Sequence, residues 1–363
     1  MRPVRASISL GALRHNLAAA RQRSRNARLW AVVKANAYGH GLRRIEPALA
    51  AADGLALLET DDAVLLRERG WKKPLLMLEG YFNTEEAAVF ARHGFTTVIH
   101  QAEQIDMLER APLGRPLDIY LKLNTGMNRL GIRPEAALET IQRLGGSGKA
   151  GSITLMTHFA EADGARGIAA PLAAFDLVTR GMGLPASTAN SAALLRFPES
   201  HRDWVRPGIM LYGCSPFAHQ SAASFGLQPV MTLKSRVIAL QHIMQGERIG
   251  YAGAFTADRP MRVGVVACGY ADGYPRHAPA GTPVLVDQKR SRTLGLVSMD
   301  MLFVDLTDLP EAGVGSDVTL WGEGLSADEV ALAAGTLSYE LLCALSARVP
   351  VSVTDEPAMP SRG

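Results

Sequence analysis

The stretch LWAVVKANAYGHG, residues 29–41, joins an apolar run to a lysine and a glycine-rich turn. The letters LWAVV suit one buried strand, and Lys34 follows where that strand ends. Further short apolar runs occupy residues 55–59, 74–79, 96–100, 118–123, 152–159, 186–190 and 205–213. Stretches with helical spacing, such as residues 85–94, separate these runs. Strands that alternate with helices at about 25 residues per unit predict a parallel, right-handed (β/α)₈ barrel.

The character of the sequence changes at about residue 226. Segments rich in β-forming residues follow, such as PVMTLKSRVIAL at 229–240, and Gly, Pro and Asp turns separate them. A chain of 363 residues also exceeds the usual span of one hydrophobic core. We therefore expect an α/β fold with a TIM-type barrel over residues 1–225 and a mainly-β domain over residues 226–363. The first few residues are free to join the β domain.

Composition excludes several classes of protein. The 38 basic and 35 acidic residues leave a net charge of +3, and the basic residues form no stripe, so nucleic acid is not an expected partner. Cys214, Cys268 and Cys343 lie far apart, which favours neither a disulfide framework nor a thiolate metal site. No apolar run reaches membrane length, and the start of the chain lacks a secretory signal. We expect a cytoplasmic protein without a metal site.

Reactive groups in such a barrel lie where strands end and loops begin. Lys34 ends the first apolar run, and partial burial there favours the neutral, nucleophilic amine that forms a Schiff base. The alternative is a lysine whose stem packs on apolar neighbours while its ammonium reaches water. Lys34 alone does not decide between these two interpretations.

The fifth run alternates in a way that directs a lysine inward. Ile119 and Leu121 share the face that must meet the helices, so Lys122 points into the barrel. A bare ammonium there costs several kcal/mol, so Lys122 needs a nearby carboxylate or a chemical modification. Arg129 lies in the next loop, and its fixed donors suit an anionic oxygen.

The last three runs end in polar residues as well. His158 closes the sixth run, Ser191 follows the seventh, and Arg206 and Gly208 lie in the eighth. The Ser191 hydroxyl and the backbone N–H groups around Gly208 can cradle a phosphate. Taken singly, His158 is a typical strand-end histidine and Arg206 a typical surface ion pair. Their coincidence at one end of one barrel favours a shared site.

The motifs that carry these residues are similar to those of the alanine racemase family: VVKANAYGHG, LKLNTGMNRLG, THFA, ANSAA, VRPGIMLYG, IGYAGAF, GYADGYPR and VSMDM. They match in order from about residue 5 to residue 353. The resemblance implies pyridoxal 5′-phosphate (PLP) as cofactor, an N-terminal barrel, a C-terminal β domain and a homodimer. It also implies interconversion of L-alanine and D-alanine, and leaves open whether the cell makes D-alanine or degrades alanine with it.

The resemblance assigns the catalytic pair by position. Lys34 would hold PLP covalently through its amine and act as one acid/base, and Tyr251 would be the opposite base, supplied by the other subunit. Two bases on two faces of the α-carbon explain inversion. His158 would link Tyr251 to Arg206, and Arg206 would face the pyridine nitrogen.

The resemblance also assigns the binding residues. The cofactor phosphate would be held by Tyr38, Ser191, Gly208 and Ile209. Arg129 would contact the phenolic oxygen of the cofactor or the substrate carboxylate, and the Met299 N–H would contact that carboxylate from the partner subunit. Tyr270 would narrow the entrance, and Lys122 occupies a position that is carbamylated in many family members.

One departure from the family pattern concerns specificity. ALSARVPV places Ala347 where some members have a tyrosine, so a wider pocket and a broader small-amino-acid racemase form the close alternative. A PLP decarboxylase can share the barrel-plus-β plan, but it would require a carboxylate in place of Arg206. A non-catalytic PLP-binding barrel would need neither Tyr251 nor Met299.

Overall fold

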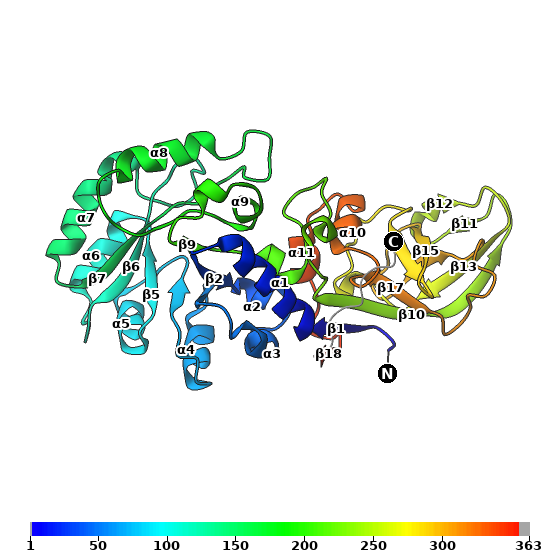
Figure 1. Cartoon of the computed structure of the whole chain (residues 1–363). Coiled ribbons are helices and arrows are strands. Elements are labelled where there is room, and N and C mark those ends of the chain that lie inside the picture. Colours follow the sequence, from blue (N-terminus) through cyan, green and yellow to red (C-terminus); the bar gives the residue numbers. More distant parts are fainter. Residues whose placement is uncertain (1, 356–363) are drawn as a thin grey trace. The chain divides into compact units, whose positions relative to one another are not determined.

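The computed structural model describes residues 2–355, and these form two compact units (Figure 1). The barrel unit consists of Leu17–Ala37 and Leu49–Leu211. The β unit consists of the described residues up to Asn16, of Tyr38–Ala48 and of the described residues from Tyr212 onward. The PLP-lysine candidate Lys34 therefore lies in the barrel unit, and Tyr38 belongs to the β unit.

The barrel unit closes eight parallel strands in chain order. These are β2 (Arg28–Val32), β3 (Gly54–Leu57), β4 (Leu75–Met77), β5 (Thr96–Ile99), β6 (Leu117–Lys122), β7 (Ala150–Met156), β8 (Ala186–Ser187) and β9 (Trp204–Val205). The helices that follow them are α4 (Thr60–Glu68), α5 (Thr84–His93), α6 (Ala102–Arg110), α7 (Ala137–Gly146), α8 (Ala169–Thr179) and α9 (Ser191–Arg196). The prediction of a (β/α)₈ barrel is confirmed.

The eighth apolar run contributes less strand than its length indicates. Only Trp204 and Val205 form β9, which pairs with β2 and closes the barrel. Ile209–Tyr212 instead forms the 3₁₀ helix η4. Pro207 has no N–H to give to a ladder, so the strand ends before it, although its carbonyl still accepts from Val32 N–H over 3.0 Å.

The β unit is built around one mainly antiparallel sheet. Its strands are β1 (Arg5–Ser9), β10 (Met231–Ile243), β13 (Met261–Val266), β14 (Pro283–Val286), β15 (Lys289–Leu294), β16 (Leu302–Asp305), β17 (Asp317–Trp321) and β18 (Val351–Thr354). β10 pairs with both β13 and β17, so the strands from β13 through β16, β15, β14 and β17 return to β10 in a ring. The predicted mainly-β C-terminal fold is confirmed.

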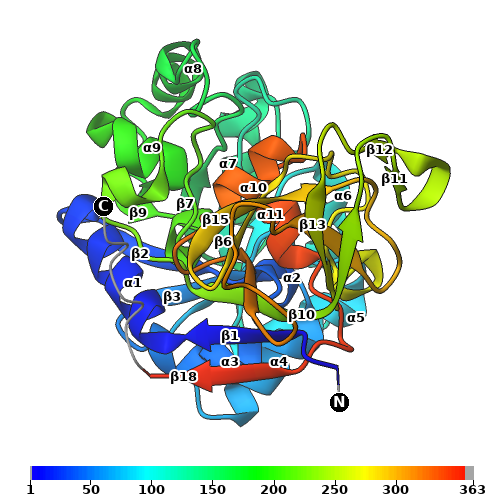
Figure 2. The same cartoon turned by 90° about the vertical axis from the view of Figure 1, so that its right-hand side faces the viewer.

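The start of the chain belongs to this sheet. β1 runs antiparallel to β10 and parallel to β18, and Figure 2 shows β1 and β18 side by side. A separate hairpin joins β11 (Arg248–Ile249) to β12 (Phe255–Thr256). The remaining α-helices among residues 2–355 are α1 (Leu10–Ser24), α2 (Lys34–Tyr38), α3 (Leu42–Ile45), α10 (Ala327–Ala333) and α11 (Ser338–Cys343). Within residues 2–355, no helix combines the length and apolarity needed to cross a membrane.

Candidate active site

Lys34 opens a turn with an unusual backbone. Ala35, Asn36 and Ala37 have φ values of 53°, 51° and 57°, so the short helix α2 is left-handed. Each non-glycine residue in that conformation costs about 1–2 kcal/mol. The hydrogen bond from Ala37 N–H to the Val33 carbonyl, 2.8 Å long, helps to hold the turn. Backbone strain of this kind concentrates at functional sites, which favours a functional role for Lys34.

Lys122 lies inside the barrel, as its position in the alternating run predicts. The Trp30 indole N–H on β2 donates to the Tyr120 hydroxyl on β6 over 2.9 Å. β2 and β6 are opposite strands of the closed barrel, so this contact crosses the interior. Lys122 is two residues beyond Tyr120 and shares its face, and only 7% of Lys122 is exposed.

The electrostatic surroundings of Lys122 oppose a charged ammonium. Burial, followed by the positive charges of Arg206, Arg129 and Lys34, lowers the pKa of Lys122 to about 8. The nearby Glu79 carboxylate acts in the opposite direction but does not offset these effects. At mildly alkaline pH, Lys122 is therefore a neutral amine in a substantial fraction of the protein molecules.

Arg206 is buried with neutral hydrogen-bond acceptors and no ion-pair partner among residues 2–355. It is 4% exposed, and its guanidinium donates to the Ser187 hydroxyl over 2.7 Å and to the Thr157 carbonyl over 2.6 Å. A third bond reaches the Thr188 carbonyl at 3.3 Å. Burial lowers the pKa of Arg206 to about 10, which still leaves it charged at neutral pH. The alternative of a surface ion pair is wrong for this residue.

His158 completes a cluster of basic groups in the barrel unit. Burial lowers the pKa of His158 well below its ordinary value, and the positive charges of Arg206, Lys122, Arg129 and Lys34 add to this effect. The imidazole is therefore neutral at pH 7. A cluster of basic groups in which Lys122 and Arg206 are buried suits an anionic ligand.

Three candidate phosphate ligands also lie together in the barrel unit. The Gly208 backbone N–H donates to the Ser191 hydroxyl over 2.8 Å, and Ile209 is the next residue in the chain. Ser191 begins α9, where the Asn190 side chain caps the helix by accepting from Ala193 N–H at 3.0 Å. A hydroxyl beside successive backbone N–H groups is a typical cradle for phosphate oxygens.

Tyr38 belongs to an aromatic cluster of the β unit. Its ring stacks on Tyr212 with centroids 4.6 Å apart, and the His40 ring lies at the same distance from Tyr212. Gly39 has φ +77°, and a Cβ there would collide with the Leu342 carbonyl oxygen, so only glycine fits. Burial, followed by the charge of Cys343, raises the pKa of Tyr38 above its ordinary value. Tyr38 therefore offers a protonated hydroxyl, a hydrogen-bond donor.

The β unit exposes the other three candidates. Tyr251 is 69% exposed in the turn between β11 and β12, Met299 is 54% exposed, and Tyr270 is 39% exposed. The Tyr270 N–H donates to the Ser298 carbonyl over 3.0 Å, which brings the Tyr270 and Met299 segments together. Large apolar side chains at the surface are a common mark of contact with another molecule.

Most of the further residues of the site lie outside the quoted motifs, and Thr157, the first residue of THFA, is the exception. Ser187 and the Thr157 and Thr188 carbonyls hold Arg206, and Trp30 and Tyr120 fill the barrel beneath the cluster. Ser187 and Thr188 lie in the apolar run at 186–190, so polar residues within an apolar run were the signal available for these two.

Family models match almost the whole chain. The model for the N-terminal domain of alanine racemase matches residues 8–216, and the model for the C-terminal domain of alanine racemase matches residues 230–353. A catabolic alanine racemase from Klebsiella aerogenes is 54% identical over 351 residues, which cover 96% of this chain and 99% of that protein.

Solved structures agree with these matches. The biosynthetic alanine racemase of Pseudomonas aeruginosa has a TM-score of 0.95 at 47% identity, covering 98% of this chain and 100% of that chain. An alanine racemase from Bartonella henselae, crystallised with covalently bound pyridoxal phosphate, has a TM-score of 0.87 at 26% identity and covers 98% of this chain and 100% of its own. The chain therefore belongs to the alanine racemase family of enzymes.

Proposed function

We propose that this chain is a PLP-dependent racemase that interconverts L-alanine and D-alanine. The observation that carries the proposal is the buried Arg206, bonded to a hydroxyl and two carbonyls and grouped with Lys34, Lys122 and His158. Membership of the alanine racemase family supports the activity. The relative from Bartonella henselae, with its covalently bound pyridoxal phosphate, supports the cofactor.

The residues present fit this cofactor. Ser191, Gly208 and Ile209 offer a hydroxyl and backbone N–H groups to a phosphate, and Tyr38 offers a further hydroxyl donor. The Lys34 amine is the group that would join the cofactor covalently. When bound, PLP delocalises the negative charge that develops at the substrate α-carbon.

Arg206 sets the protonation of the pyridine nitrogen. It remains a charged donor at neutral pH, and it would leave that nitrogen without a proton, unlike a carboxylate partner. An unprotonated pyridine nitrogen would make bound PLP a weaker electron acceptor, and the Arg206 position would thereby disfavour side reactions that need a long-lived carbanion. A PLP decarboxylase of similar plan would place a carboxylate at this position.

Lys34 and Tyr251 act as the two bases of the proposed reaction. One removes the α-proton from one face of the substrate and the other returns a proton to the opposite face, so the centre inverts. An ordinary tyrosine holds its proton at neutral pH, so the Tyr251 anion needs hydrogen bonds or positive charge nearby. His158, with Arg206 beyond it, supplies these in the proposed arrangement, and Tyr251 comes from the partner subunit.

The remaining residues bind and admit the substrate. Arg129 contacts the phenolic oxygen of the cofactor or the substrate carboxylate, and the partner's Met299 donates its backbone N–H to that carboxylate. Tyr270 narrows the entrance. Lys122, as a carbamate, provides an anion that faces Arg129, which agrees with the lowered pKa of its amine.

The proposed enzyme is a cytoplasmic homodimer with shared active sites. Cys214, Cys268 and Cys343 form no disulfide among residues 2–355, which suits a reducing compartment. The exposed Tyr251, Tyr270 and Met299 suit a surface that a second subunit covers.

A broader small-amino-acid racemase is the second candidate, because Ala347 is small and exposed. Incubation of the purified, PLP-loaded protein with L-alanine, followed by chiral chromatography, tests the proposed function. We expect an equal mixture of L-alanine and D-alanine from an alanine racemase and from a broader small-amino-acid racemase alike. Conversion of L-serine at a comparable rate would favour the second candidate, and no conversion of any amino acid would favour a PLP-binding barrel without catalysis.

A further inference from the structure

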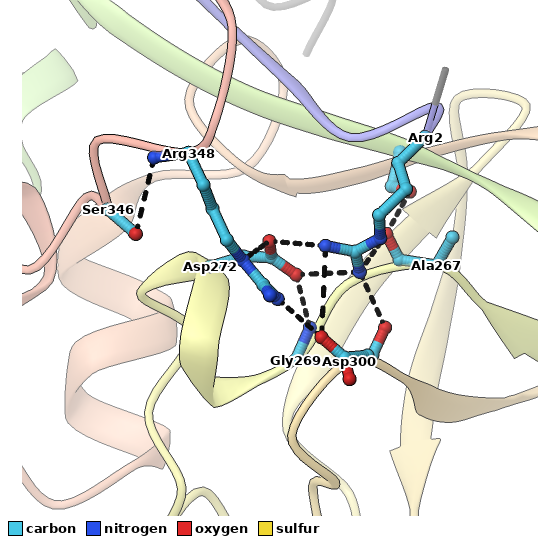
Figure 3. Close-up of polar contacts among 8 residues, drawn as sticks. Arg2, Ala267, Gly269, Asp272, Asp300, Ser346 and Arg348 are labelled. Atoms are coloured by element: carbon cyan, nitrogen blue, oxygen red, sulfur yellow. Dashed lines mark hydrogen bonds and ion pairs between the residues drawn. The ribbon is translucent and has the colours of Figure 1, made fainter.

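Asp272 is the centre of an ion-pair cluster in the β unit, outside the residues assigned above (Figure 3). Its side chain is fully buried and accepts from Arg2 over 2.7 and 3.0 Å. Arg348 donates from Nε to Asp272 over 2.8 Å and from Nη2 to the Asp300 carboxylate over 2.6 Å. Arg2 also donates to the Asp300 backbone carbonyl over 2.8 Å. We call Arg2, Asp272, Asp300 and Arg348 the anchor cluster.

The anchor cluster joins segments that are far apart in sequence. Arg2 precedes β1, Asp272 ends the 3₁₀ helix η7 (Tyr270–Asp272), and Arg348 lies shortly before β18. Asp300 directly follows Met299. The two residues that the β unit offers to an active site, Tyr270 and Met299, are thus each within two residues of a carboxylate of the cluster.

The backbone around Asp272 is packed without spare room. The Tyr270 and Ala271 N–H groups donate to the Ser298 and Met299 carbonyls, both over 3.0 Å. A Cβ on Gly269 would collide with those same two carbonyl oxygens. Gly273 has φ +106°, and a Cβ on this residue would collide with the Ala344 carbonyl oxygen. The sequence GYADG therefore fits between the Met299 segment and the segment that leads to Arg348.

Asp272 is held as an anion. Burial acts to raise its pKa, but hydrogen bonds from Arg2, Arg348 and the Gly269 N–H outweigh burial and lower it below its ordinary value. Two arginines and two aspartates balance in charge. A buried carboxylate with several charged donors fixes geometry strongly, because removal of one partner leaves the others unpaired.

We propose that the anchor cluster positions the Tyr270 and Met299 segments for racemisation, so that Asp272, Arg348 and Asp300 are positioning residues of the active site. This inference rests on the proposed function, in which Tyr270 lines the entrance and the Met299 N–H contacts the substrate carboxylate. The cluster ties both segments to the start and the end of the described chain. A displacement of about 1 Å in a substrate contact can lower the rate by as much as about 100-fold.

The test compares Asp272→Asn with Asp317→Asn in the PLP-loaded enzyme. Asp317 is a matched control because it is also shared by two arginines, Arg236 at 2.9 Å and Arg5 at 3.4 Å, one of them near the start of the chain. We expect Asp272→Asn to lower kcat/KM for alanine by roughly 10- to 100-fold, mainly through KM. Asp317→Asn should stay within about twofold of the wild type, as expected for a half-exposed pair.

Two readouts separate positioning from general loss of structure. In Asp272→Asn, hydrogen exchange should accelerate at the amides of residues 270–271 and 298–301, while barrel amides keep wild-type rates. The visible absorbance of the bound cofactor should persist, because its proposed lysine is in the barrel unit. Arg348→Lys, which keeps the charge but cannot bridge Asp272 and Asp300 with one planar group, should show an intermediate loss.

Several outcomes would overturn the inference. The inference is rejected if Asp272→Asn keeps the wild-type kcat/KM and the wild-type rates of hydrogen exchange at residues 270–271 and 298–301. If Asp272→Asn fails to fold, Asp300→Asn replaces it, since the Asp300 side chain is 47% exposed, and unchanged KM and exchange in that variant would also reject the inference. If the wild type does not racemise alanine, the proposed function fails, and local hydrogen exchange alone decides whether the cluster holds these segments.

Discussion

Arg206 donates from Nη2 to the carbonyl oxygen of Thr157 over 2.6 Å, and Thr157 directly precedes His158 in the chain. The guanidinium is thereby fixed to the strand end that carries the imidazole. Arg206 is also the first charged group that depresses the pKa of His158, after burial itself. The two residues are thus coupled through the backbone and through charge, and predictions about one involve the other.

The pH dependence of His158 follows from its lowered pKa. A histidine that stays neutral in the folded protein but takes up a proton when unfolded makes stability decline as pH falls below about 6.5. We expect NMR titration of the ring to place the pKa of the folded imidazole well below the ordinary histidine value. The wild type should also lose more stability than His158→Gln between pH 7 and pH 5 in urea unfolding. Titration of the ring near its ordinary pKa would contradict this prediction.

Lys34→Ala should abolish both covalent cofactor binding and racemisation. The wild type should show visible absorbance that borohydride reduction removes, and the variant should lack it. Activity should fall by about 10⁴-fold, the upper range for loss of an acid/base group. The exposed Lys72 in the same unit provides the control, since Lys72→Ala should leave both signals intact. A reducible chromophore in Lys34→Ala would assign the cofactor to another lysine.

Much of the fold could be predicted because the apolar runs are well separated. The strands β2 to β7 each lie at or within one of the predicted apolar runs. The later strands of the described chain, β10 to β18, all lie in the β-rich sequence after residue 226. β8 and β9 have only two residues each, and they pair because the barrel closes. Their extent depends on neighbours distant in sequence, which no local pattern encodes.

The site was predictable where a residue ends a strand, and hidden where distant segments meet. Lys34, Lys122 and Arg206 follow from position in a run, and the structure gathers them in one unit. The left-handed turn after Lys34 has the sequence Ala-Asn-Ala, which contains no glycine to announce it. Arg2 contacts Asp272 across 270 positions, and such a contact leaves no local signal.

Carbamylation of Lys122 should be detectable by carbon NMR. The neutral amine attacks CO₂, an N–C bond forms, one proton leaves, and the resulting anion lies near Arg129 and Arg206. Protein equilibrated with ¹³C-bicarbonate near pH 8, about the pKa of this amine, should show a carbamate carbonyl signal. Lys122→Arg should lack the signal, and short carboxylates should restore activity to Lys122→Ala. Identical spectra for the wild type and Lys122→Arg would leave Glu79 as the acidic partner instead.

The shared active site of the proposed homodimer is tested by mixing two inactive variants. Lys34 lies in the barrel unit and Tyr251 in the β unit, and the proposed reaction takes one from each subunit. In a heterodimer of Lys34→Ala and Tyr251→Phe subunits, one site carries both lesions and the other carries neither. Random pairing gives about half heterodimers with one intact site each, or roughly a quarter of wild-type sites, by the two-fold symmetry of such a dimer.

The activity of co-expressed variants should therefore rise well above that of either parent, and native mass spectrometry should confirm the heterodimers. If Tyr251 served its own chain, each heterodimer would hold one site without its lysine and one without its tyrosine, and mixing would restore nothing. Confirmed heterodimers with activity no higher than the parents would thus reject the shared site or the role of Tyr251 as second base. Co-expression of Lys34→Ala with itself under the same conditions gives the baseline, because that pairing contains no intact site.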